Sequence, residues 1–183
     1  MKLLILDKNQ TVVRSKLGKP FIQNPTDQEP IEGVYRLLDG YQPDYNIVIV
    51  SNQWGLENGF KTLEDTIAEM QYAMKLFPQI QDCFFCPNSE GSLCYRVWGQ
   101  GETEWTEYGD LTDNGYITEF GLGVLAVGKN NYRKPKPGML SLAMLSYSAA
   151  PDDTLFIGDR DTDKEAAEAI GIRYRDINDW LKR

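Results

Sequence analysis

Short apolar runs alternate along the chain with longer segments in which apolar residues recur every three or four positions. The runs predict buried strands at residues 2–6, 46–50, 82–86 and 154–157, with a short final strand near 172–174. The periodic segments predict helices at residues 30–40, 62–77, 139–147 and 162–170. This alternation is typical of an α/β fold, a parallel sheet flanked by helices on both faces.

Local signals mark the ends of two of these helices. Thr62 and Asp65 have the spacing of a capping box at the start of the longest helix, and Pro78 ends it. Gly40 is the expected C-cap of the helix before it.

Residues 88–131 lack regular periodicity and are rich in Gly, Thr, Tyr and Trp. We interpret them as an insertion of loops and hairpins within a single domain that spans residues 1–183, because ~100–200 residues is usual for one domain. The insertion follows a strand, where α/β folds carry loops that cover sites. Its aromatic side chains are either a stacking surface for a base or sugar, or packing within the insertion; they are Tyr95, Trp98, Trp105 and Tyr108.

The composition removes several kinds of chemistry. The chain has 183 residues, a net charge of -8, three Cys and no His. Without His, no Ser-His-Asp or Cys-His catalysis and no imidazole metal ligand is possible.

The negative charge argues against broad nonspecific binding to nucleic acid or to an anionic membrane. The odd Cys count and the lack of a long apolar run make the cytoplasm the expected location.

Polar clusters follow three of the predicted strands, at Asp7–Thr11, Ser51-Asn52 and Gly158–Asp163. Lys134 and Lys136 precede the third helix. Parallel topology brings the carboxyl ends of strands to one edge of the sheet, so these groups are expected to meet there. Carboxylates, a hydroxyl and a lysine suit phosphoryl transfer assisted by a hard divalent metal.

Four segments resemble the motifs of the haloacid dehalogenase (HAD) superfamily, in the order that the superfamily has them. They are Leu6-Asp7 through Thr11, Val50 through Gly55 (VSNQWG), Arg133 through Met139 (RKPKPGM) and Ile157 through Asp163 (IGDRDTD). The chain most resembles the branch with histidinol-phosphate phosphatase, heptose bisphosphate phosphatase and the phosphatase domain of polynucleotide kinase 3′-phosphatase. The resemblance implies a Rossmann-like HAD fold and a phosphomonoesterase of class EC 3.1.3.

The resemblance also implies roles for individual residues. Asp7 would attack phosphorus and form an aspartyl-phosphate, while Lys134 would neutralise charge. Ser51 and the backbone of Asn52 would hold phosphate oxygens, and Arg133 would reach the substrate. The implied Mg²⁺ ligands are Asp7, the backbone carbonyl of Asn9, Asp159 and, in support, Asp163.

One departure concerns turnover. The superfamily has a second Asp where this chain has Asn9, and that Asp protonates the leaving group and then activates water. An amide cannot exchange a proton near neutral pH, and general acid–base catalysis is worth ~10²–10⁴-fold. Three explanations stay open: a deliberate Asp→Asn change that traps a complex, a naturally slow enzyme, or a phosphate-binding protein with impaired catalysis.

A second departure concerns zinc and the substrate. Cys86-Pro87-Asn88 keeps only the first ligand of the branch's zinc loop, so no zinc is expected. The expected partner is a small phosphorylated substrate, and neither a membrane nor a particular oligomer is implied. A nucleic-acid 3′-phosphate end is the alternative, because Gly18–Phe21 and the SNQ-x-G motif resemble the polynucleotide 3′-phosphatases.

Overall fold

A computed structural model describes residues 2–99, 104–108, 116–120, 123–127 and 131–182. Its main sheet has seven strands in the order β11-β10-β1-β4-β5-β6-β7. The strands are β1 (Lys2–Leu6), β4 (Tyr45–Asn52), β5 (Ile80–Cys86), β6 (Cys94–Trp98), β7 (Glu104–Tyr108), β10 (Thr154–Gly158) and β11 (Arg173–Asp176). From β11 to β5 all neighbours are parallel, so the predicted α/β fold with a parallel sheet is confirmed.

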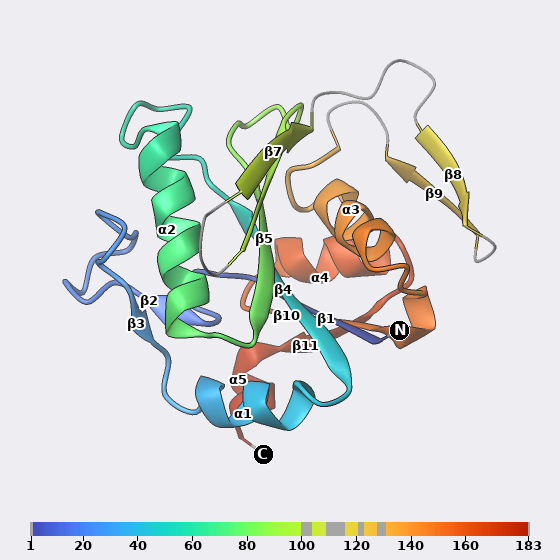
Figure 1. Ribbon diagram of the computed structural model, residues 1–183, viewed down its shortest axis with the longest axis horizontal. Coiled ribbons are helices and arrows are strands. Elements are labelled where there is room, and N and C mark those ends of the chain that lie inside the picture. The colour runs from blue at the N-terminus through green and yellow to red at the C-terminus, as the bar shows by residue number, and fades with distance from the viewer. Residues whose placement is uncertain (1, 100–103, 109–115, 121–122, 128–130, 183) are drawn as a thin grey trace.

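Helices cover both faces of this sheet (Figure 1). The described helices are α1 (Val34–Tyr41), α2 (Leu63–Leu76), α3 (Gly138–Ser146), α4 (Asp161–Glu168) and α5 (Ile177–Leu181), with a 3₁₀ turn at Pro151–Asp153. Buried residues of α1, α2 and α5 share one hydrophobic cluster, and those of α3 and α4 share the other. The sheet therefore lies between two cores.

The central strand shows why the strand signals were continuous apolar runs. Leu4 and Leu6 face the first core, whereas Leu3 and Ile5 face the second, and all four are fully buried. Successive side chains of a strand point to opposite faces, so a strand covered on both sides needs apolar residues at every position.

The helix signals were correct in type and less accurate at the ends. Thr62 and Asp65 form the capping box of α2. The first helix starts at Val34, four residues later than predicted, and Gly40 lies inside it while Gln42 is its C-cap. The glycine that matters is Gly33, whose φ of 88° lies in the left-handed region that favours glycine.

The segment after β5 contributes strands to the main sheet. β6 pairs antiparallel with β5, and β7 with β6. The short strands β8 (Tyr116–Phe120) and β9 (Gly123–Val127) pair with each other, as do β2 (Val13–Arg14) and β3 (Glu29–Pro30). Tyr95 is buried and stacks on Phe85, with ring centroids 5.1 Å apart, so it packs within the molecule. The side chains of Trp105 and Tyr108 lie outside the described residues.

None of the helices in the described part of the chain has the length and apolar character that crossing a membrane requires. The three thiols are buried and unpaired with one another. Burial raises the pKa of Cys86 to about 11, which keeps that thiol protonated at neutral pH.

Candidate active site

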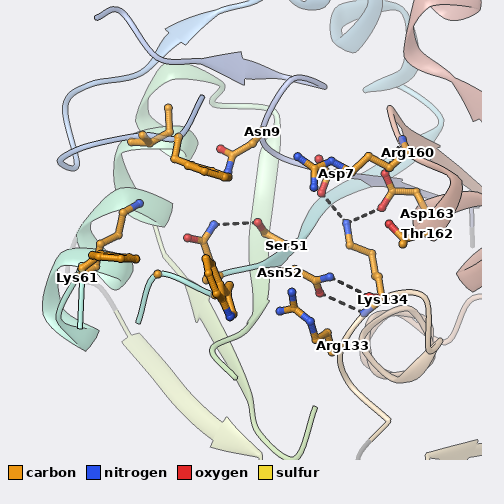
Figure 2. Close-up of a pocket in the computed structure, with 16 residues that line it drawn as sticks. Asp7, Asn9, Ser51, Asn52, Lys61, Arg133, Lys134, Arg160, Thr162 and Asp163 are labelled. Carbon is orange, nitrogen blue, oxygen red and sulfur yellow. Dashed lines mark hydrogen bonds and ion pairs between the residues drawn. The ribbon is translucent and has the colours of Figure 1, made fainter. Parts of the chain in front are cut away.

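Asp7 stands directly after β1, at the carboxyl edge of the sheet. Its backbone N–H donates to the carbonyl of Ile157 at 2.9 Å, which ties it to the neighbouring strand β10. Its Oδ1 lies 2.5 Å from Nζ of Lys134 (Figure 2). The two residues are 127 positions apart in sequence, and the parallel sheet brings them together.

Lys134 is the centre of the site. Besides Asp7, its Nζ contacts Oδ1 of Asp163 at 2.7 Å and donates to the carbonyl of Val50 at 3.3 Å. Burial opposes the charged ammonium, but the two carboxylates outweigh it and raise the pKa of Lys134. The lysine is therefore a buried, permanently charged cation between two carboxylates.

The turn that carries Lys134 is held by Asn52. The Asn52 amide donates to the Lys134 carbonyl at 3.0 Å and its Oδ1 accepts from the Lys134 N–H at 3.1 Å. Gly138 is required next to it, because a Cβ there would lie 2.5 Å from the Asn131 carbonyl oxygen. Sequence reasoning considered the Asn52 backbone and missed this use of the side chain; only the adjacency of the SNQ motif to the strand end could have suggested it.

Three carboxylates form an acidic cluster beside the lysine. Asp7, Asp159 and Asp163 each offer an oxygen within 4.8 Å of the others'. Oδ2 of Asp163 accepts from the backbone N–H groups of Asp159 and Arg160, both at 3.2 Å. A Cβ on Gly158 would lie 2.5 Å from that oxygen, so glycine is needed there. Asp163 thus holds the loop and the lysine, while Asp159 presents its carboxylate to the cluster.

The surroundings of the cluster favour the protonated forms of Asp159 and Asp7. Burial, together with the charges of Asp7 and Asp163, raises the pKa of Asp159 to about 6. Burial also raises the pKa of Asp7, and the charge of Asp163 adds to this, whereas Lys134 opposes it. A hard cation prefers carboxylate oxygens and would relieve this repulsion. The donor set therefore fits Mg²⁺.

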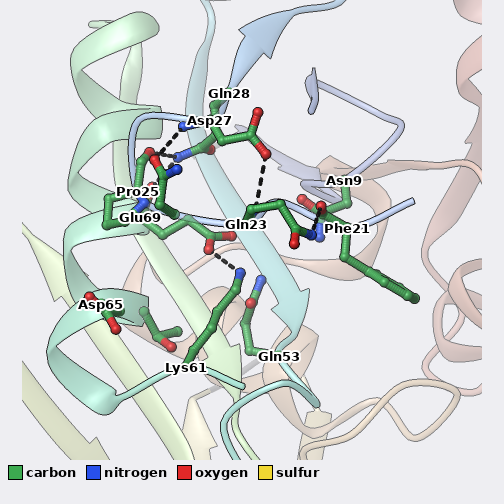
Figure 3. A network of polar contacts seen from close by, with 12 residues as sticks. Asn9, Phe21, Gln23, Pro25, Asp27, Gln28, Gln53, Lys61, Asp65 and Glu69 are labelled. Atoms are coloured by element: carbon green, nitrogen blue, oxygen red, sulfur yellow. Dashed lines mark hydrogen bonds and ion pairs between the residues drawn. The ribbon is translucent and has the colours of Figure 1, made fainter. Parts of the chain in front are cut away.

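Asn9 belongs to a second polar network, which the sequence did not reveal. Its Oδ1 accepts from Nζ of Lys8 at 3.2 Å, and that lysine lies 2.5 Å from Oε1 of Glu69. The other oxygen of Glu69 contacts Nζ of Lys61 (Figure 3). Lys8 and Glu69 are fully buried, and burial lowers the pKa of Lys8 while Glu69 opposes the change. With all groups ionised, the network carries one excess positive charge.

One pocket of about 270 Å³ brings most of the predicted site residues together (Figure 2). The predicted residues that line it are Asp7, Asn9, Ser51, Asn52, Arg133, Lys134 and Asp163. Ser51 is buried there, and its Oγ accepts from Gln53 at 2.9 Å, which leaves the hydroxyl proton available. Nη1 of Arg133 is buried and has no hydrogen-bond partner among the described residues. Asp161 and Lys136 are exposed and do not line the pocket.

Similarities to known proteins bear on the chemistry of this site. A family model described as HAD-hydrolase-like matches residues 131–174. D-glycero-beta-D-manno-heptose-1,7-bisphosphate 7-phosphatases from two strains of Neisseria meningitidis are each 24% identical over 177 residues, covering 93% of this chain and 74% of theirs.

Solved structures share the fold. A D,D-heptose 1,7-bisphosphate phosphatase from B. bronchiseptica, solved with magnesium and phosphate, has a TM-score of 0.64 and 22% identity over 95% of this chain and 79% of its own. A putative HAD-like phosphatase from Mesorhizobium loti has a TM-score of 0.61 and 19% identity over 100% of this chain and 85% of its own. With the sequence matches, these findings show that the chain is similar to phosphatases of the HAD superfamily over most of its length and shares their fold.

Proposed function

We propose that the chain is a Mg²⁺-dependent phosphomonoester hydrolase that works through an aspartyl-phosphate on Asp7. The observation that carries this proposal is the 2.5 Å contact between Asp7 and the buried ammonium of Lys134, beside the acidic cluster. The phosphatase names of the relatives support it, and they make a small phosphorylated molecule the first substrate class to test.

In the first step a carboxylate oxygen of Asp7 attacks phosphorus, and the bond from phosphorus to the leaving oxygen breaks. Lys134 keeps Asp7 ionised and neutralises charge on the transferring group, because a cation in a dry site acts strongly on developing charge. The Ser51 hydroxyl and the Asn52 N–H hold phosphoryl oxygens. Asp7, Asp159 and the Asn9 carbonyl, with Asp163 in support, would hold Mg²⁺, which supplies further charge neutralisation when bound.

Asn9 stands where the site needs a group that can donate and accept a proton. The leaving oxygen needs a proton, and the water that hydrolyses the aspartyl-phosphate must lose one. The Asn9 amide performs neither transfer, and its oxygen already accepts from Lys8. We therefore propose slow turnover. The same observation favours a second candidate function, a protein that binds phosphorylated ligands with impaired catalysis.

Phosphate release from p-nitrophenyl phosphate, with and without Mg²⁺, tests the proposal. The wild-type protein should release phosphate slowly, and Asp7→Asn should abolish both the release and any acid-stable phosphoenzyme. Asp161→Asn is the matched control, because Asp161 is an exposed aspartate beside the site and should leave the rate unchanged. Activity retained in Asp7→Asn would move the nucleophile elsewhere. A panel of phosphoesters with no hydrolysis but with saturable binding would favour the binding function.

A further inference from the structure

Exposed aromatic side chains gather at the pocket that holds Asp7. Phe21, Trp54 and Phe60 line this pocket and are 59%, 47% and 76% exposed. The described residues contain two other exposed large hydrophobic side chains, Leu17 and Tyr35, and neither lines the pocket. Leaving apolar area in water forgoes ~25 cal/mol per Å². A concentration of such area at a candidate site therefore indicates a ligand surface.

The rings come from two separate segments of the chain. Trp54 and Phe60 lie in the loop between β4 and α2, with ring centroids 6.5 Å apart in an edge-on arrangement. Phe21 lies in the segment between β2 and β3, and its ring points away from the Glu69 network (Figure 3). These three residues are called the aromatic rim below.

Hydrogen bonds hold the loop that carries Trp54 and Phe60 in a defined conformation. The Phe60 N–H donates to the Gly55 carbonyl at 2.9 Å, and the Asn58 amide donates to the Trp54 carbonyl at 2.9 Å. The loop is also anchored to the sheet, because the Gln53 N–H donates to the Cys86 carbonyl at 2.8 Å. The rings are thus presented from a structured loop, and a ligand that stacks on them need not order it first.

The rim adjoins the position expected for the phosphoryl group. Trp54 follows Ser51 by three residues, and both line the same pocket as Asp7. The organic group of a phosphate ester bound at Asp7 would extend from the polar side chains around Asp7 toward the aromatic rings. The neighbouring Lys61 is already paired with the buried Glu69, so the contact that the rings offer is mainly apolar.

We propose that the aromatic rim is a subsite for the leaving group, and that it binds a planar aromatic ring by stacking. This proposal rests on the proposed function and narrows its substrate class to phosphomonoesters of alcohols that carry an aromatic ring. Nucleosides and simple aryl alcohols share that chemistry. Stacking on an aromatic side chain tolerates any planar ring, because each has a π-face.

The test compares KM for esters that differ in the ring. The panel is 1-naphthyl phosphate, a nucleoside 5′-monophosphate, a nucleoside 3′-monophosphate and glucose 6-phosphate, each with wild-type protein, Trp54→Leu and Phe60→Leu. Wild-type protein should have a KM at least about tenfold lower for the aromatic esters than for glucose 6-phosphate. In either variant, the ratio of the KM for glucose 6-phosphate to the KM for the aromatic esters should fall toward one. A preference confined to nucleotides or to 1-naphthyl phosphate identifies the source of the ring.

Tyr35→Leu is the matched control, because it also replaces an exposed aromatic ring, on α1 away from the pocket. It should keep the wild-type ratio. Equal KM values for aromatic and sugar esters in the wild-type protein would overturn the subsite. So would Trp54→Leu and Phe60→Leu proteins that fold and keep the wild-type ratio, or that raise every KM equally, as a general cover over the pocket would require.

Binding separates this proposal from the proposed function. Titration calorimetry with phenylphosphonate and methylphosphonate, which carry no ester bond, measures the ring's contribution without turnover. Tighter binding of phenylphosphonate to wild-type protein than to Trp54→Leu supports the subsite, even when no ester is hydrolysed and the enzyme proposal fails. Hydrolysis of the esters with equal binding of the two phosphonates leaves the enzyme standing and overturns the subsite.

Discussion

Asn9→Asp is the most informative single change, because it introduces the carboxylate that the site lacks. Asn9 Oδ1 lies 3.2 Å from the ammonium of Lys8. Two unit charges at that distance attract by about 5 kcal/mol at an effective dielectric constant near 20. Removing a carboxylate from water costs several kcal/mol, so the two effects roughly cancel. We expect the free energy of unfolding to change by no more than about 2 kcal/mol.

The charge balance of the surrounding network supports that expectation. Lys8 and Lys61 share the single carboxylate of Glu69, and a second carboxylate at position 9 would bring the network to neutrality. The new side chain would also be able to donate a proton to the leaving oxygen and accept one from water. General acid–base catalysis is worth ~10²–10⁴-fold, so kcat should rise by about 10²-fold or more.

Steady-state phosphate release with Mg²⁺ measures the gain, and urea unfolding measures the stability. Asn178→Asp makes the same chemical change on the exposed surface of α5 and should leave kcat unchanged. An Asn9→Asp protein that folds normally and hydrolyses no faster would refute the assignment of the deficit to Asn9. A loss of much more than about 2 kcal/mol in the free energy of unfolding would refute the expectation that attraction to Lys8 offsets the cost of desolvating the new carboxylate.

Three further outcomes follow from the geometry of the site. Lys134→Met leaves Asp7 and Asp163 buried without their cation, so urea unfolding should show a loss of about 3–5 kcal/mol and phosphate release should stop; a stable, active variant would contradict the central role of the lysine. Gly158→Ala puts a methyl group 2.5 Å from the Asp163 carboxylate, so Mg²⁺ titration by calorimetry should show affinity weakened about 10-fold or more, as is usual when support for a metal ligand is lost; unchanged affinity would show that the loop tolerates the displacement. Asp159 has a pKa of about 6 against 3.8 unfolded, so the folded state binds the extra proton: the destabilisation is present above about pH 6 and is relieved as the pH falls toward 3.8. Urea unfolding of metal-free protein should therefore give a stability gap between Asp159→Asn and wild type that narrows from pH 7 to pH 4, and Mg²⁺ affinity of the wild type should fall below about pH 6; a constant gap would contradict the raised pKa.

The sequence alone determined the parallel strands, the helices α1 to α4 and the position of most candidate site residues. Local periodicity decides which segments become strands or helices, and a strand buried on both faces is visible as an unbroken apolar run such as Leu3–Leu6. The polar residue that ends such a run, Asp7 for example, must lie at the carboxyl edge of a parallel sheet. Helix ends were less well determined, because tertiary packing competes with weak local signals such as Gly40.

Only the tertiary structure decided which polar side chains outside the predicted cluster became partners. Lys8 meets Glu69 across 61 residues, and Asn52 holds the backbone of Lys134 across 82. Neither contact has a local pattern, because a side-chain hydrogen bond depends on where two distant segments fold back. The aromatic rim was hidden for the same reason: the rings that reach the pocket stand in loops. Of the two roles that the sequence left open for Tyr95, the structure shows packing, because this ring stacks on Phe85. Local sequence patterns thus determined which strands and strand ends form the site. Long-range folding determined how its charged groups pair and which aromatic side chains surround the pocket.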